Sequence, residues 1–216
     1  MTISRRQFVG SAGAAAVGLS VLERDHRAPD ADPSGLVTGK PKPLPYTEVK
    51  GFLSKDQVRW HHDSHYGGAL RGFVKLDADP TGNHRPRIAK ANSVLLHELY
   101  FDNMAAKKSD PGQATRAALK KRFGDLDRWI EDFRAAAKSC RGWAVLSWHP
   151  VNGKLYNVCT DSHDDGPVWS GVPLVVADTY EHSYYIDFQN RKADYVNGFT
   201  DHINWTAVEQ RVRALG

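Results

Sequence analysis

The chain has 216 residues, of which 41% are hydrophobic and 25% are charged, so it is long enough for one or two small domains that share a core. Its net charge of +4 is modest and no basic stripe with interleaved aromatic residues occurs, so nothing indicates a nucleic-acid partner, whereas a small anionic substrate is compatible. The two cysteines, Cys140 and Cys159, have no Cys or His neighbour at metal-binding spacing, which argues against a thiolate metal site.

The first 42 residues have the features of an export leader and a linker. Ser4-Arg5-Arg6-Gln7-Phe8-Val9 matches a twin-arginine export signature, and a mildly apolar run rich in Gly and Ala follows it over 10–22. That run is too short for a stable membrane span. We expect residues 1–22 to be a signal peptide for export to the periplasm, with an ordinary basic N-terminus as the alternative. Residues 23–42, rich in Pro, Asp and Gly, are expected to be a flexible linker.

Two helices are expected in the next part of the chain. Residues 54–70 form the first, capped by Ser54, with Val58, His61, His65 and Ala69 along one face. Residues 92–104 form the second, which contains His97, and a turn-rich connection over 77–86 separates them. Together they predict a helical hairpin domain over 43–106.

The remaining chain mixes helices and strands. The expected helices cover 114–123, 126–139, 181–188 and 204–215, and the expected strands cover 142–148, 155–160 and 173–177. Asn152-Gly153 is typical of the turn of a hairpin between the first two strands. Because that register offsets Cys140 from Cys159 by several residues, both are expected to be free thiols. The chain is therefore predicted to be an α+β protein whose C-terminal α/β domain (107–216) has a small three-stranded antiparallel sheet.

One stretch of this C-terminal domain indicates metal chemistry. The apolar run 173–177 ends in Asp178, and His182 follows on the first turn of the next predicted helix, so both side chains can face one point. Imidazole with carboxylate suits zinc, iron or manganese. His61, His65 and His97 are candidates for further ligands, although each is also explained as a core or surface histidine, and Asp178 as a helix cap.

Five segments occur together in a definite order, namely Leu44-Pro45-Tyr46, the pair His61 and His65, the helix around His97, Gly142-Trp143-Ala144-Val145-Leu146, and Asp178-Thr179-Tyr180-Glu181-His182-Ser183-Tyr184-Tyr185-Ile186-Asp187. In these segments the chain resembles the iron/manganese superoxide dismutase family from residue 44 to residue 205. The resemblance implies one iron or manganese ion per subunit, held by His61, His97, Asp178 and His182. It also implies conversion of superoxide to oxygen and hydrogen peroxide, with iron preferred over manganese.

The resemblance extends to residues around the ligands. It implies that His65 bonds Tyr185 across a homodimer interface, that Glu181 bonds His182 of the partner subunit, and that Trp143 lies beside the metal. The residue that usually bonds the metal's solvent ligand comes from one of two places, which hold Ser93 and His163 here. We therefore expect His65, His163 and Tyr185 to take part in catalysis.

Other positions depart from the family's pattern. Ala69 replaces a tyrosine at the substrate entrance, and Phe101, Val145 and Tyr180 replace tryptophans. These changes keep open the alternative of a dismutase-like periplasmic metal-binding protein with weak or no dismutase activity. A zinc hydrolase is a weaker alternative because the sequence has no His-Glu-x-x-His pattern.

Overall fold

The computed structural model describes residues 32–79, 81–164 and 170–215. The expected signal peptide, residues 1–22, lies outside the described residues, as does the first part of the expected linker. Among the described residues, none of the helices combines the length and the apolar character that crossing a membrane requires.

The first helical rod contains three segments, α2 (Lys55–Trp60), the π-helical η1 (His61–Tyr66) and α3 (Gly67–Asp77). Ser54 caps it as expected, because its Oγ accepts a hydrogen bond from the Gln57 N–H at 3.2 Å. The rod runs beyond residue 70, where the predicted helix ends. The widened π turn was not predicted, and such turns are frequent at functional sites.

The second long helix, α4 (His84–Asp102), begins at His84 rather than at the expected residue 92. Gly82 and Asn83 both have positive φ values, 68° and 47°, and make the turn that precedes it. Pro86 lies in the first turn of α4, where its missing N–H costs no hydrogen bond. The helix therefore extends into the segment that looked turn-rich in the sequence.

The described end of the expected linker is a packed strap, which corrects the prediction for residues 32–42. This N-terminal strap (residues 34–42) contains the short helix α1 (Gly35–Thr38). The Gly35 N–H donates to Glu98 Oε1 at 2.8 Å, and the Lys42 N–H donates to the Tyr66 hydroxyl at 2.7 Å. Both bonds reach residues far along the chain, which composition alone does not reveal.

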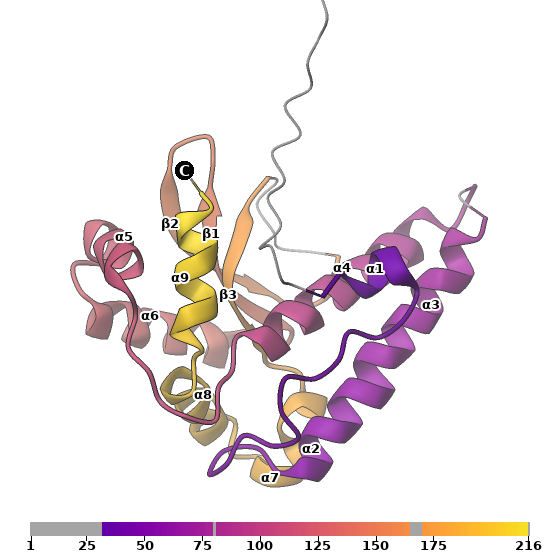
Figure 1. Ribbon diagram of the computed structural model, residues 1–216, viewed down its shortest axis with the longest axis horizontal. Coiled ribbons are helices and arrows are strands. Elements are labelled where there is room, and N and C mark those ends of the chain that lie inside the picture. Colours follow the sequence, from indigo (N-terminus) through magenta and orange to yellow (C-terminus); the bar gives the residue numbers. More distant parts are fainter. Residues whose placement is uncertain (1–31, 80, 165–169, 216) are drawn as a thin grey trace, which may run out of the picture.

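The C-terminal part is built on a three-stranded antiparallel sheet, as the sequence predicted, and the strand order is β2-β1-β3. The strands are β1 (Trp143–His149), β2 (Lys154–Thr160) and β3 (Val172–Asp178). The helices α5 (Gln113–Phe123) and α6 (Leu126–Ser139) precede them within about one residue of the expected bounds. In Figure 1 the α3–α4 hairpin lies on one side of the sheet and α5 and α6 on the other. The register pairs Trp143 with Asp178, which sets both beside the donor cluster described below.

After β3 the chain forms η2 (Glu181–Ser183), α7 (Tyr185–Phe188), α8 (Lys192–Asp201) and α9 (Trp205–Arg213). Helix α8 was not predicted. Its Gly198 weakens helical propensity, but a Cβ there would lie 2.6 Å from ring atoms of Phe52, so the glycine allows close packing. Tyr195, Val196 and Phe199 on this helix are buried in the core.

The two halves share one core, so the chain is a continuous unit around their junction. Asn103, fully buried at the end of α4, accepts a hydrogen bond from the Val176 N–H of β3 at its Oδ1, at 2.6 Å. Its own backbone carbonyl accepts from the Asn204 N–H at 2.7 Å. The first bond fixes the end of α4 against β3, two residues before Asp178, and the second fixes it against the start of α9.

Candidate metal centre

Four donor side chains from four elements meet at the junction of the two halves. They are His61 on η1, His97 on α4, Asp178 at the end of β3 and His182 on η2, and one donor atom from each lies within 4.8 Å of the others. From Asp178 Oδ2, the Nε2 atoms lie at 3.0 Å for His61, 3.2 Å for His182 and 3.6 Å for His97. The structure therefore brings together the four residues that the sequence singled out as ligands.

The hydrogen bonding of His97 indicates that this cluster is suited to bind a metal ion. Its Nδ1 donates to the Ser93 carbonyl oxygen at 2.7 Å, which leaves Nε2 as the atom with a free lone pair. That Nε2 is buried and has no hydrogen-bond partner among the described residues. A buried nitrogen without a partner is costly unless something binds it, and three imidazoles with one carboxylate suit iron, manganese or zinc.

The protonation states also favour a cation. Burial raises the pKa of Asp178, but the neighbouring His182 and His61 outweigh that effect and hold the pKa well below its usual range. Burial lowers the pKa of His61 and lowers that of His97 further still. An anionic carboxylate beside neutral imidazoles is the state in which such side chains bind metal ions.

The backbone around Asp178 is held by several hydrogen bonds. Its Oδ1 accepts from the Tyr180 N–H at 2.9 Å, and its carbonyl oxygen accepts from the Tyr195 hydroxyl at 2.7 Å and the Ser183 hydroxyl at 3.0 Å. On the opposite side, Gln57 Nε2 donates to the His182 carbonyl oxygen at 2.7 Å. Sequence reasoning missed Tyr195 and Gln57, although Gln57 lies one helical turn before His61 and is fully buried, which is a usable signal.

Solvent approaches the cluster from the side of His182. The side chains of His61, His97 and Asp178 are buried, whereas that of His182 is 21% exposed. The exposed ring of His65 stacks on the ring of His182 with centroids 3.9 Å apart. Burial, helped by the nearby His182 and His61, lowers the pKa of His65 to about 4, so its imidazole is neutral at pH 7.

Aromatic rings surround the donors, including two of the positions that depart from the family's pattern. Trp143 meets the His97 ring edge to face at 5.1 Å, Tyr180 stacks on His182 at 5.2 Å, and Phe101 lies 5.1 Å from His61. Trp143 Nε1 also donates to His163 Nδ1 at 3.0 Å. His163 therefore lies beside the aromatic residues that surround the donors.

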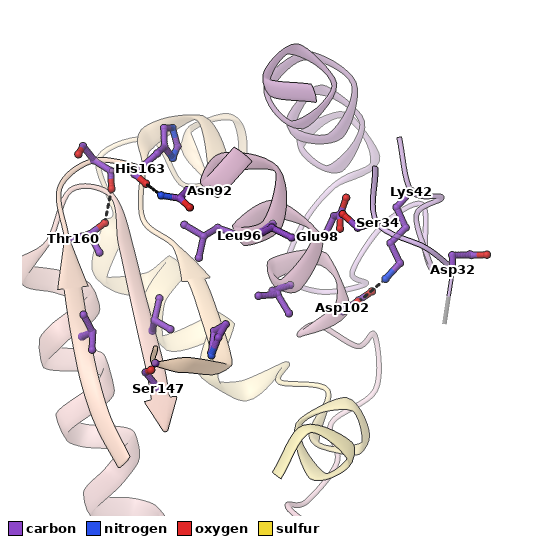
Figure 2. A pocket seen from close by; sticks show the side chains of 17 residues that line it. Asp32, Ser34, Lys42, Asn92, Leu96, Glu98, Asp102, Ser147, Thr160 and His163 are labelled. Carbon is purple, nitrogen blue, oxygen red and sulfur yellow. Dashed lines mark hydrogen bonds and ion pairs between the residues drawn. The ribbon is translucent and has the colours of Figure 1, made fainter. Parts of the chain in front are cut away.

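A cavity of about 510 Å³ lies between α4 and the sheet, but none of the four donor residues lines it. Figure 2 shows His163 and Asn92 at one end of it and the Lys42–Asp102 ion pair at the other. Asn92 Nδ2 donates to the His163 carbonyl oxygen at 2.7 Å. Val145, the third of the residues that replace tryptophans, lines this cavity rather than the donor cluster.

The other residues that the sequence analysis singled out lie around the donor cluster, and they differ from one another in exposure and contacts. Glu181 is exposed and Tyr185 is 50% exposed, and within the described part of one chain His65 contacts His61 and His182 rather than Tyr185. Ser93 lies behind His97, with its Oγ 3.3 Å from Nδ1. Ala69, at the position expected to widen the substrate entrance, is only 4% exposed.

Tyr66 bonds the N-terminal strap and α4. Its hydroxyl donates to Glu98 Oε1 at 2.9 Å and accepts from the Lys42 N–H of the strap. The side chain is buried.

Residues 111–211 match the family model described as iron/manganese superoxide dismutases, C-terminal domain. A superoxide dismutase [Fe] of Aquifex aeolicus is 30% identical over 178 residues, which cover 74% of this chain and 84% of that protein. A superoxide dismutase [Mn] 2 of Haloferax volcanii is 29% identical over 178 residues, covering 76% and 89%. A superoxide dismutase [Fe] of Cupriavidus metallidurans is 30% identical over 178 residues, covering 75% and 89%.

A helical hairpin and an α+β half that share a largely buried set of three imidazoles and one carboxylate define a class of mononuclear metalloprotein. Within that class, the chain belongs to the iron/manganese superoxide dismutase family. The resemblance seen in the sequence and the predicted fold class are both confirmed.

Proposed function

We propose that this protein is a superoxide dismutase that converts superoxide to oxygen and hydrogen peroxide at one iron or manganese ion, held by His61, His97, Asp178 and His182. The observation that supports this assignment best is the convergence of the four donors around His97 Nε2, which has no hydrogen-bond partner within the described part of the chain. Both iron and manganese enzymes occur among the relatives. The bound ion supplies the one-electron chemistry by alternating between its +3 and +2 states.

The chain's own side chains select the substrate. Asp178 is the single anionic donor, so the charge of a divalent or trivalent ion is only partly neutralised and a small anion is attracted. The buried donors and the rings of Trp143, Tyr180 and Phe101 leave an approach beside His182. Such an approach suits a diatomic anion better than a larger substrate.

We propose that two histidines, His65 and His163, hold protons near the reaction. His65 is neutral at pH 7 and lies between solvent and His182. His163 accepts the Trp143 N–H at Nδ1, and because burial lowers its pKa, its remaining proton is on Nε2, which is then a hydrogen-bond donor. A donor of this kind tunes the electron affinity of a nearby ion, and with His163 in that position we propose iron over manganese.

We further propose that two subunits pair through the face around the substrate approach. Trp60, Tyr185 and Ile186 are large side chains that are about half exposed. Glu181 and His65 are exposed on neighbouring elements. A homodimer contact through Glu181 with His182 and through His65 with Tyr185 would cover this face and complete the surroundings of each metal.

The proposed location is the periplasm, reached through the twin-arginine pathway. This proposal is supported by the pair Arg5 and Arg6 and by the apolar run over 10–22. Fusion of residues 1–42 to a reporter, with Arg5→Lys and Arg6→Lys together as the control, tests it directly. Export that is unaffected by the double substitution would contradict it.

The test of the activity is metal analysis of the protein purified from its own cells, combined with a superoxide-decay assay. We expect iron or manganese at about one ion per chain and decay that disappears when the ion is removed by a chelator. Bound iron or manganese without decay would support the alternative of a metal-binding protein. Bound zinc would rule out the redox mechanism.

A further inference from the structure

The two cysteines lie at the same end of one helix, although they are remote from each other in the sequence. Cys140 caps the C-terminus of α6, and its Sγ lies 3.8 Å from the Ala137 carbonyl oxygen. Cys159 lies on β2, and its Sγ is 3.4 Å from the carbonyl oxygen of Ala136, the residue before Ala137 on α6. The two thiols therefore share the last turn of α6, and their side chains are close enough to interact. Both are free thiols, as expected from the sequence.

The two thiols differ in exposure, which suits them to different roles. Cys159 is exposed, whereas Cys140 is only 3% exposed. The exposed thiol can meet a small oxidant from solvent, and the buried one is protected from it.

Lys192 gives this pair a cationic neighbour. Its Nζ donates a hydrogen bond to the Cys140 carbonyl oxygen, and its charge interacts with both thiols. Burial raises the pKa of Cys140 and the Cys159 thiol raises it further, while Thr179 and Lys192 act in the opposite direction. A cation beside two thiols stabilises a thiolate as it forms.

We propose that Cys140 and Cys159 form a peroxide-reactive dithiol, in which the exposed Cys159 attacks hydrogen peroxide and the buried Cys140 then closes a reversible intramolecular disulfide. In the first step the Cys159 thiolate attacks one peroxide oxygen, an S–O bond forms, the O–O bond breaks, and hydroxide leaves and is protonated to water. The Cys159 sulfur is oxidised to a sulfenic acid by two electrons, and the peroxide is reduced. In the second step Cys140 sulfur attacks the sulfenic sulfur, the S–S bond forms as the S–O bond breaks, and the leaving hydroxide takes up the Cys140 thiol proton to become a second water. Two thiols and one peroxide thus give one disulfide and two waters.

The source of the oxidant rests on the proposed function, since hydrogen peroxide is the product of dismutation. The dithiol is also connected to the metal centre through one residue. Cys140 Sγ lies 3.5 Å from the Thr179 hydroxyl, which donates to the Gly142 carbonyl oxygen at 2.9 Å. Thr179 directly follows Asp178 in the chain. Formation of the disulfide would draw the Cys140 sulfur towards Cys159 and away from this contact.

The experiment treats the full, metal-loaded protein with hydrogen peroxide and measures intact mass and free thiols. We expect the loss of two hydrogens, a fall from two reactive thiols to none after denaturation, and a peptide that contains Cys140 linked to Cys159. A dithiol reductant should reverse all three changes. Two thiols that persist, or a link between two chains instead of within one, would overturn the proposal.

Single substitutions separate the two roles. In Cys140→Ser the reaction should stop at the Cys159 sulfenic acid, which a cyclic diketone traps. In Cys159→Ser the buried Cys140 should stay reduced at the same peroxide concentration. Equal reactivity of Cys140 in Cys159→Ser would overturn the assignment of roles. Ser139→Ala, which removes only the hydroxyl 3.7 Å from Cys159 Sγ, is the matched control and should still form the disulfide.

Because peroxide is added directly, this test does not depend on dismutase activity. Normal superoxide decay with no disulfide would overturn this inference alone. A disulfide formed by added peroxide in a protein that does not accelerate superoxide decay would overturn the proposed function alone, and with it the source of the oxidant.

Discussion

At the scale of single residues, the sharpest feature in the described part of the chain is a pair of buried histidine nitrogens that lack hydrogen-bond partners there. His97 Nε2 faces the donor cluster, and His149 Nδ1 lies at the end of β1. Only the first has a carboxylate and two further imidazoles nearby among the described residues. The two positions therefore separate the loss of a ligand from the loss of an imidazole with one buried nitrogen.

His97→Ala should lower bound iron or manganese from about one ion per chain to near zero. Its unfolding temperature should no longer rise when metal is added, because stabilisation by a ligand needs a folded state that binds it. His149→Ala is the control, and should keep both the ion and the response to metal. Metal analysis with calorimetry checks this, and a His97→Ala protein that still holds a full complement of ion would contradict the assignment.

Trp143 and Trp129 offer a second matched pair. Both are fully buried and both donate from Nε1, Trp143 to His163 and Trp129 to Asn157 Oδ1 at 3.1 Å. Trp143→Phe and Trp129→Phe should each lower the free energy of unfolding by about 1 to 3 kcal/mol, from one hydrogen bond and some buried volume. Only Trp143→Phe should slow superoxide decay several-fold at unchanged metal content. Equal rates in the two variants would remove His163 from the reaction.

The pKa of His65 predicts how the stability of the metal-free protein depends on pH. Its pKa is about 4 in the folded chain against an ordinary value of 6.5, so between these values the unfolded chain binds more protons. The free energy of unfolding therefore decreases as pH falls from about 6.5 to about 4. His65→Gln should make this decrease smaller. Urea titrations across this pH interval measure the effect, and identical slopes in the two proteins would contradict it.

At the scale of elements, the Tyr66 hydroxyl is one of the groups that hold the N-terminal strap. Tyr66→Phe leaves the Lys42 N–H without its acceptor and removes one of two donors to Glu98 Oε1, which still accepts from the Gly35 N–H. We expect a loss of about 1 to 3 kcal/mol in the free energy of unfolding and faster proteolysis within residues 34–42. Tyr46→Phe is the control, since its hydroxyl donates to the Phe101 carbonyl oxygen at 3.0 Å and does not hold the strap. Cleavage at the same rate in both variants would show that Tyr66 does not anchor the strap.

Much of the element pattern could be predicted because it depends on neighbours in sequence. Ser54 caps a helix by accepting from the N–H of Gln57, three residues later. Asn152-Gly153 lies in the turn that joins the antiparallel strands β1 and β2. The strap and α8 could not be predicted in this way. The strap is held by Glu98, 63 residues after Gly35, and α8 tolerates Gly198 because Phe52 packs against it. Such stabilisation by distant residues has no local signal.

The same distinction applies to the metal centre. Asp178 and His182 were suggested by their own spacing at the end of a strand, whereas His61 and His97 were assigned only through the family resemblance. The supporting residues Gln57 and Tyr195 were missed because their contacts, to the carbonyl oxygens of His182 and Asp178, are to backbone atoms. Any side chain of suitable length can make such a contact, so residue type alone does not identify it.

At the scale of the whole molecule, the exposed face around the substrate approach carries the prediction about assembly. Ile186→Asp places a charge among Trp60 and Tyr185, and desolvating that charge in an interface is costly. We expect dimers to dissociate to monomers in sedimentation experiments. Val151→Asp is the control, because Val151 is also highly exposed but lies in the β1–β2 hairpin turn. Dimers that persist in Ile186→Asp would place the subunit contact elsewhere.

His61 and Asp178 lie 3.0 Å apart but 117 positions apart in the chain. An ion bound to both side chains acts as a cross-link that closes a very long loop. For a loop of about 100 residues, a cross-link lowers the conformational entropy of the unfolded chain by an amount equivalent to about 4 to 5 kcal/mol. A chelator should accordingly loosen the entire polypeptide instead of one local pocket. During synthesis, the four-residue site cannot form until His182 has left the ribosome, so most of these 216 residues must emerge before all four donors can bind the ion.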